Sequence, residues 1–111
     1  MNGIYQEIPS LSVDDIMDRL HSANSEELTL LLLGLTELDD WPWVQDVYLK
    51  FINDKNIWIA SAAISGLGDL ARIHRQIGKE HVVKALTDLA SSRKELIGKI
   101  GDALDDIAIF T

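Results

Sequence analysis

Histidines and adjacent aspartates are the side chains of this sequence with the most obvious chemical potential. The three histidines, His21, His74 and His81, fall at the ends of different expected helices, and none has a histidine partner four residues away. A helical histidine metal site needs that spacing, because it places both rings on one face. Asp39-Asp40 and Asp105-Asp106 could offer carboxylates to a magnesium ion, but neighbouring residues on a helix point in different directions and neither pair has calcium-loop spacing. We therefore expect no metal site and interpret the histidines as surface or helix-end residues.

Glycine and nucleophile patterns do not indicate an active site either. The segment Gly66-Leu67-Gly68 could be taken for part of a phosphate-binding loop, but helical periodicity continues on both sides and no Gly-Lys pair follows. We interpret these glycines as packing residues. No serine, threonine or lysine stands in a nucleophile-elbow pattern. The sequence thus predicts a protein that is not an enzyme, with no cofactor and no small-molecule substrate.

The three tryptophans favour binding over catalysis. Trp41 and Trp43 flank a proline next to two aspartates, and Trp58 shares a helical face with Asp69, opposite the apolar face of its own helix. Packing between helices and contact with a partner are both open for Trp43 and Trp58, since tryptophan is usually largely buried. Trp41 lies in a short acidic loop, so we expect it to be an exposed anchor of a protein interface.

The charge of the chain is strongly uneven along its length. The formal net charge is −8, with eleven acidic and two basic residues in 1–54 and seven acidic and eight basic residues in 55–111. Phosphate backbones attract basic surfaces, so nucleic-acid binding is not expected. A basic protein partner would suit the acidic first half, although solubility alone would also explain it.

Two acidic patches could face such a partner. One surrounds the expected start of the helix that follows residue 40, and its rival lies on the first expected helix. The candidate partner-binding residues are the acids Glu37, Asp39, Asp40 and Asp46 of the one patch, Asp14, Asp15 and Asp18 of the other, and the tryptophans Trp41, Trp43 and Trp58.

The stretch 59–70 is expected to form the central helix, against which the helices that carry these residues pack. Its apolar residues recur at positions i, i+3, i+4 and i+7, and Ala, Ser and Gly on its flanks allow neighbouring helices to approach closely. Residues 97–103 repeat the pattern of residues 64–70, including the Gly-Asp step, and residues 32–38 repeat it more loosely. The pattern predicts a stack of about three helical repeats, in which Leu67 and Ile100 hold equivalent inward positions.

Caps and breaks place the other helices. We expect Ser25, Asp40 or Trp41, Asn56 and Ser91-Ser92 to cap helices, and Pro42 to lie in a first helical turn. The leucine-rich helix after residue 25 should be flanked on more than one side. Residues 1–11 read as an extended lead-in or cap. The expected helices lie around residues 13–21, 26–35, 42–51, 57–75, 82–90 and 93 to the C-terminus.

Composition predicts one all-α domain over residues 1–111. Apolar residues make up 47% and charged residues 25%, which is ordinary globular usage, and there is no cysteine for a disulfide or a thiolate metal site. The Leu30–Leu35 run is too short to span a bilayer, and the N-terminus has no signal-peptide pattern. We expect a cytoplasmic protein without membrane contact.

The order of branched, small and apolar residues in 59–70 resembles the second helix of a HEAT-like repeat, of the short kind found in bacterial proteins. This resemblance implies a right-handed α–α superhelix of about three helical pairs. Many members of the family carry an arginine just after the leading branched residue. Here that position is Ala60, and Arg93 holds the matching place in the last copy.

A small, acidic, cysteine-free helical repeat also resembles immunity proteins of bacterial contact-dependent inhibition and related polymorphic toxin systems. The resemblance implies a cognate basic toxin, with a nuclease as the expected class, whose active site is covered by acidic side chains that stand in for phosphates. The alternative is a HEAT-like scaffold or adaptor that holds another protein without inhibiting it. Rescue of cells from a toxin would separate the two hypotheses.

Overall fold

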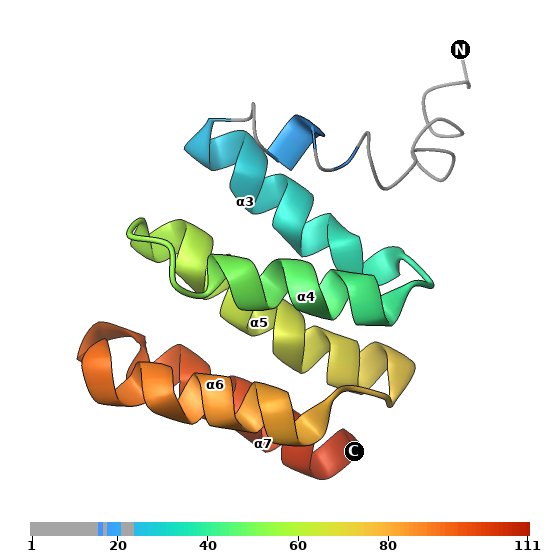
Figure 1. Ribbon diagram of the computed structural model, residues 1–111, viewed down its shortest axis with the longest axis vertical. Coiled ribbons are helices and arrows are strands. Elements are labelled where there is room, and N and C mark those ends of the chain that lie inside the picture. The colour runs from blue at the N-terminus through green and yellow to red at the C-terminus, as the bar shows by residue number, and fades with distance from the viewer. Residues whose placement is uncertain (1–15, 17, 21–23) are drawn as a thin grey trace.

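The computed structural model describes residues 16, 18–20 and 24–111, and the regular elements in these parts are all helical (Figure 1). The predicted all-α fold is therefore confirmed. Residues 16 and 18–20 are helical. In chain order, the elements after them are α3 (Ser25–Gly34), the 3₁₀ turn η1 (Leu35–Glu37), α4 (Trp41–Phe51), α5 (Ile57–His74), α6 (Lys79–Ser92), the 3₁₀ turn η2 (Lys94–Leu96) and α7 (Ile97–Phe110).

These helices form two layers. α3, α5 and α7 lie side by side, with α5 packed against both neighbours, while α4 packs on α5 and α6 packs on α7 (Figure 1). The chain reverses direction between α4 and α5 and again between α6 and α7, so each pair is an antiparallel hairpin (Figure 1). Two of the predicted helical pairs are thus present, and the right-handed superhelix stays a prediction.

The core is built around α5, the helix that the periodicity of 59–70 predicts. Ile64, Leu67 and Leu70 are fully buried, and Ile100 of α7 is 2% exposed. The equivalent inward positions of Leu67 and Ile100 are confirmed. Each side chain that leaves water in this way stabilises the fold by roughly 1.5–3 kcal/mol.

Two glycines allow other elements to approach α5 closely. A Cβ atom on Gly66 would lie 2.3 Å from Cζ of Tyr48, and one on Gly68 would lie 3.2 Å from the Cα atom of Ala103 in α7. The predicted role of Gly66 and Gly68 in packing is confirmed. Tyr48 fills the space over Gly66 as a fully buried side chain, and its hydroxyl donates a hydrogen bond to the carbonyl oxygen of Leu32 in α3. One phenol therefore connects three helices.

Two of the expected caps are wrong. Asn24, and not Ser25, caps α3, where its side chain accepts a hydrogen bond from the amide of Glu27 and completes a capping box. α6 continues through Ser92, and α7 begins after η2 without a side-chain cap. Serine hydroxyls can bond back to the preceding helical turn, as that of Ser92 does to the carbonyl of Leu89 at 3.2 Å, so a serine pair does not by itself mark a helix start.

The leucine-rich helix α3 is also less enclosed than its composition predicts. Leu28 and Leu32 are buried, whereas Leu30 is 70% and Leu33 45% exposed. The face of this helix that carries Leu30 is therefore open, while Leu28 and Leu32 face the core. The expected lead-in 1–11 and the expected helix 13–21 lie outside the described residues, apart from 16 and 18–20.

Candidate protein-binding site

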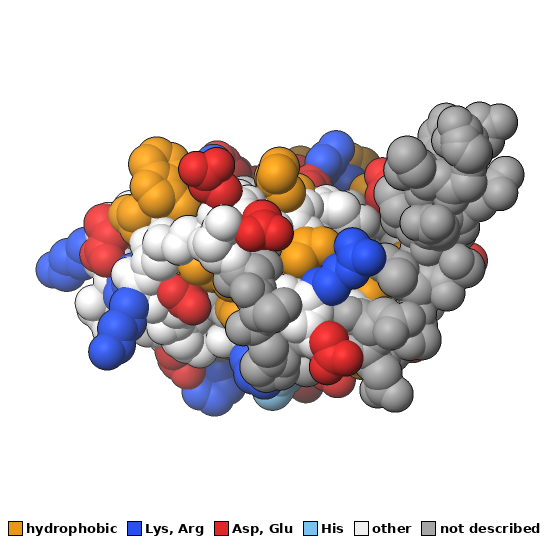
Figure 2. Space-filling model, turned by 90° about the horizontal axis from the view of Figure 1, so that it is seen from above, with side chains coloured by type: hydrophobic (Ala, Val, Ile, Leu, Met, Phe, Trp, Pro, Cys, Tyr) orange, Lys and Arg blue, Asp and Glu red, His pale blue; other side chains and the backbone are white. Residues whose placement is uncertain are grey.

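A groove lies between the first turns of α3 and α5. It has a volume of about 440 Å³ and is lined by Ser25, Glu26, Thr29, Leu30 and Trp58. Trp58 is 73% and Leu30 70% exposed, and these two are the large apolar side chains of the lining. Figure 2 views the end of the molecule that carries α3, where hydrophobic side chains lie beside acidic ones. Neighbouring exposed apolar side chains with a polar rim are typical of interaction sites.

The N-terminus of α5 determines where Trp58 lies. Asn56 caps the helix, as predicted, and its Oδ1 accepts hydrogen bonds from the amides of Trp58 at 2.9 Å and Ile59 at 3.4 Å. The next residue, Ile59, faces the core, which turns Trp58 away from it. Asn56 also donates from Nδ2 to the hydroxyl of Ser25 at 3.3 Å, which joins the starts of α5 and α3. Both sides of the groove are therefore held together by the capping residue itself.

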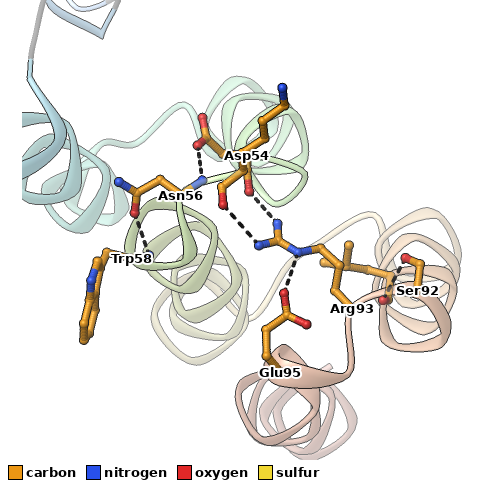
Figure 3. A network of polar contacts seen from close by, with 8 residues as sticks. Asp54, Asn56, Trp58, Ser92, Arg93 and Glu95 are labelled. Carbon is orange, nitrogen blue, oxygen red and sulfur yellow. Dashed lines mark hydrogen bonds and ion pairs between the residues drawn. The ribbon is translucent and has the colours of Figure 1, made fainter.

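Arg93 holds the segment before α5 from the other side. Its guanidinium donates hydrogen bonds to the carbonyl oxygens of Asp54 and Lys55 and forms an ion pair with Glu95 (Figure 3). Asp54 in turn accepts a hydrogen bond from the amide of Asn56 at 2.8 Å. A hydrogen bond from its own backbone and one from the Arg93 side chain lower the pKa of Glu95 below its usual range. The connection between α6 and α7 is thus tied to the turn that leads into Trp58.

The sequence singled out Arg93 only through the HEAT-like position of an arginine. In the structure this residue does link consecutive helical pairs, although through backbone carbonyls and not through a ladder of arginines. Carbonyl groups of a connecting turn carry no distinctive side-chain pattern, so the partner atoms could not be found from the sequence. Trp58 itself was a candidate, but its groove partner Leu30 was not, because a run of leucines indicates burial.

The acidic loop before α4 is arranged differently from the expectation. Asp40 caps α4 and accepts a hydrogen bond from the amide of Trp43 at 3.3 Å, as one of the two predicted alternatives. Trp41 and Trp43 are half-buried and pack against the core. The expected freely exposed anchor at Trp41 is therefore wrong, and the packing interpretation fits Trp43, whereas it is Trp58 that is exposed.

The acids of the first patch are spread from η1 into α4. Glu37, Asp39 and Asp46 are exposed, but Asp46 follows the cap by six residues, which turns its side chain by about 240° from that of Asp40 around the helix axis. These acids add to the negative charge of the surface, and their clustering around Trp41 stays a prediction. In the rival patch, Asp18 is exposed, and Asp14 and Asp15 lie outside the described residues.

The remaining predictions concern metal binding, membrane contact and the histidines. Within the described residues, no group of three or more histidines, aspartates and glutamates is placed to hold a metal ion. None of the helices in those residues combines the length and the apolar character that a membrane crossing requires. His74 uses Nε2 to contact the carbonyl of Thr36 at 3.1 Å at the end of α5, which agrees with the predicted helix-end role.

Comparison with known proteins yields no family model, no curated protein and no solved structure that matches this chain. Function must therefore be argued from the surface itself.

Proposed function

We propose that this chain is an immunity protein of the HEAT-like type, which binds a cognate basic toxin, most simply a nuclease, and blocks its active site. The observation that carries the proposal is the 73% exposed Trp58 beside Leu30 and Glu26, in a chain whose first half holds all of the net negative charge. An exposed indole in an apolar groove is the composition of an interface hot spot.

The two features would have separate roles in binding. Acidic residues of the first half would attract a basic partner from a distance, which raises the association rate and makes it dependent on salt. Trp58 would lose its water contact only in the docked complex, so it would determine how long the complex lasts. Charge reversal should therefore act on the association rate, and truncation of Trp58 on the dissociation rate.

A scaffold or adaptor would bind through the same groove, so a binding measurement alone cannot distinguish it from an inhibitor. The distinguishing property is whether the bound partner loses its activity. The test is to find a toxin-like reading frame next to the gene of this chain and to co-express the two, with cell survival as the readout. Survival supports the immunity function, whereas binding to that product without survival supports the adaptor.

Substitutions connect the result to the groove. Trp58→Ala should abolish or strongly reduce survival. Ile109→Ala is the control, because it removes a similarly exposed apolar side chain (70% exposed) from α7, and it should leave survival unchanged. Equal survival with both variants would contradict the placement of the interface at Trp58. Death of cells that express the unmodified chain would contradict the proposed function itself.

A further inference from the structure

The groove between α3 and α5 has a chemical asymmetry that goes beyond a general affinity for basic proteins. Its apolar part is formed by the Trp58 ring and Leu30, and its polar end by Ser25 and Glu26. A volume of about 440 Å³ can accommodate one or two side chains of a partner. The chemistry of those side chains is therefore what the groove can select.

Most polar atoms at the polar end of the groove already form hydrogen bonds within the protein. The Ser25 hydroxyl accepts from Asn56, and the Thr29 hydroxyl donates to the carbonyl of Ser25 at 2.8 Å. Asn24 and Glu27 are bonded to each other in the capping box. These groups form the wall of the groove, but their main hydrogen bonds are internal.

Glu26 is the exception. Its side chain is exposed and has neither a hydrogen bond nor an ion pair with any described residue. Its carboxylate therefore stands as an unpaired negative charge next to an exposed aromatic ring. A lysine or arginine could pair with that carboxylate and also lie against the indole face, where a cation gains additional attraction.

We propose that the groove binds a partner segment in which an aliphatic or aromatic side chain adjoins a lysine or arginine. The apolar side chain packs between Trp58 and Leu30, and the cation pairs with Glu26. This inference rests on the proposed function, because it specifies which part of a basic partner is recognised. A segment with only positive charge would leave the apolar walls in water, and one with only apolar side chains would leave Glu26 unpaired.

Selection from a displayed library of random peptides tests this directly, since the library contains every competing chemistry. The full chain is immobilised, and parallel selections use Trp58→Ala and Glu26→Lys. Two further baits serve as controls: Ile109→Ala removes an equally exposed side chain on α7, and Glu80→Lys reverses an acid in the second position of α6, as Glu26 is in the second position of α3. Circular dichroism establishes that each bait is folded.

Peptides selected on the unmodified chain should be enriched in an apolar residue next to a lysine or arginine. Affinity of such a peptide should fall about 30-fold or more with Trp58→Ala. Glu26→Lys should remove the preference for a cation but keep that for the apolar residue, while both controls should select the same peptides as the unmodified chain. In sedimentation experiments, the unmodified chain and Trp58→Ala should show the same degree of self-association.

Three outcomes overturn the inference. They are selected peptides without a cation, retention of the same peptides by Trp58→Ala, and occupation of the groove by a second copy of the chain. Failure here is distinct from failure of the proposed function. Cell survival without selection of such peptides leaves an immunity protein that uses another surface, and selection without survival leaves a groove that serves an adaptor.

Discussion

Replacing Gly66 by alanine tests the contact on which the packing of α4 against α5 depends. The added Cβ atom would lie 2.3, 2.5 and 2.6 Å from Cζ, Cε2 and Cε1 of Tyr48. Carbon atoms in favourable contact are about 3.5–4.0 Å apart, so the ring would have to move by about 1 Å. Tyr48 is fully buried and its hydroxyl is bonded to the carbonyl of Leu32, so the movement has no free space and breaks a hydrogen bond.

The expected free-energy change follows from three contributions. Overpacking a core costs roughly 1–3 kcal/mol, and loss of the Tyr48 hydrogen bond costs about 1 kcal/mol. Alanine in place of glycine in a helix returns about 0.5–1 kcal/mol. Gly66→Ala should therefore lower the free energy of unfolding by on the order of 1–3 kcal/mol.

Gly101→Ala is the matched control, because Gly101 is also within a helix but a Cβ atom there would meet nothing within 4 Å. Only the helix preference should act, and the variant should be more stable by about 0.5–1 kcal/mol. Urea unfolding followed by circular dichroism measures both changes, provided that the slope against denaturant is unchanged. Opposite signs are the expected result. A Gly66→Ala variant as stable as the unmodified chain would refute the close approach of Tyr48 to α5.

Two further predictions concern stability. Arg93→Met should destabilise the fold by roughly 1–3 kcal/mol, because it leaves the Asp54 and Lys55 carbonyls without their charged donor. Lys84→Met should leave stability nearly unchanged, since its pair with Asp88 is exposed, and equal melting temperatures of the two variants would contradict the role of Arg93. Burial, and to a lesser degree the charge of Asp69, raise the pKa of Tyr48, with an opposing and smaller backbone contribution at Thr36. The unfolded phenol titrates near pH 10 and the folded one only above it, so stability should be unaffected by this group below pH 10 and fall above it by up to about 1.4 kcal/mol per pH unit. Tyr48→Phe should reduce that slope in alkaline urea titrations, and an identical slope would show that Tyr48 ionises freely in the fold.

The candidate site shows where inference from sequence stops. Periodicity correctly assigned Trp58 to the face of its helix opposite the apolar residues, but it could not show whether another helix covers that face. The same limit applies to Trp41, whose acidic neighbours suggested exposure although its ring packs against the core. For Leu30, a helix of leucines indicated enclosure, and the arrangement of the described helices leaves this side chain open.

The sequence by itself determined the all-α class, the course of α5, the Asn56 cap and the packing role of Gly66 and Gly68, and it narrowed the α4 cap to Asp40 or Trp41. These depend on the helical period and on hydrogen bonds between residues at most a few positions apart, so the information is local. Only the tertiary structure decided which side chains meet across the chain. Asn56 reaches Ser25 over 31 positions and Arg93 reaches Asp54 over 39, and the groove exists because α3 and α5 start side by side. Such contacts are set by how whole helices pack, which no short pattern of residues specifies.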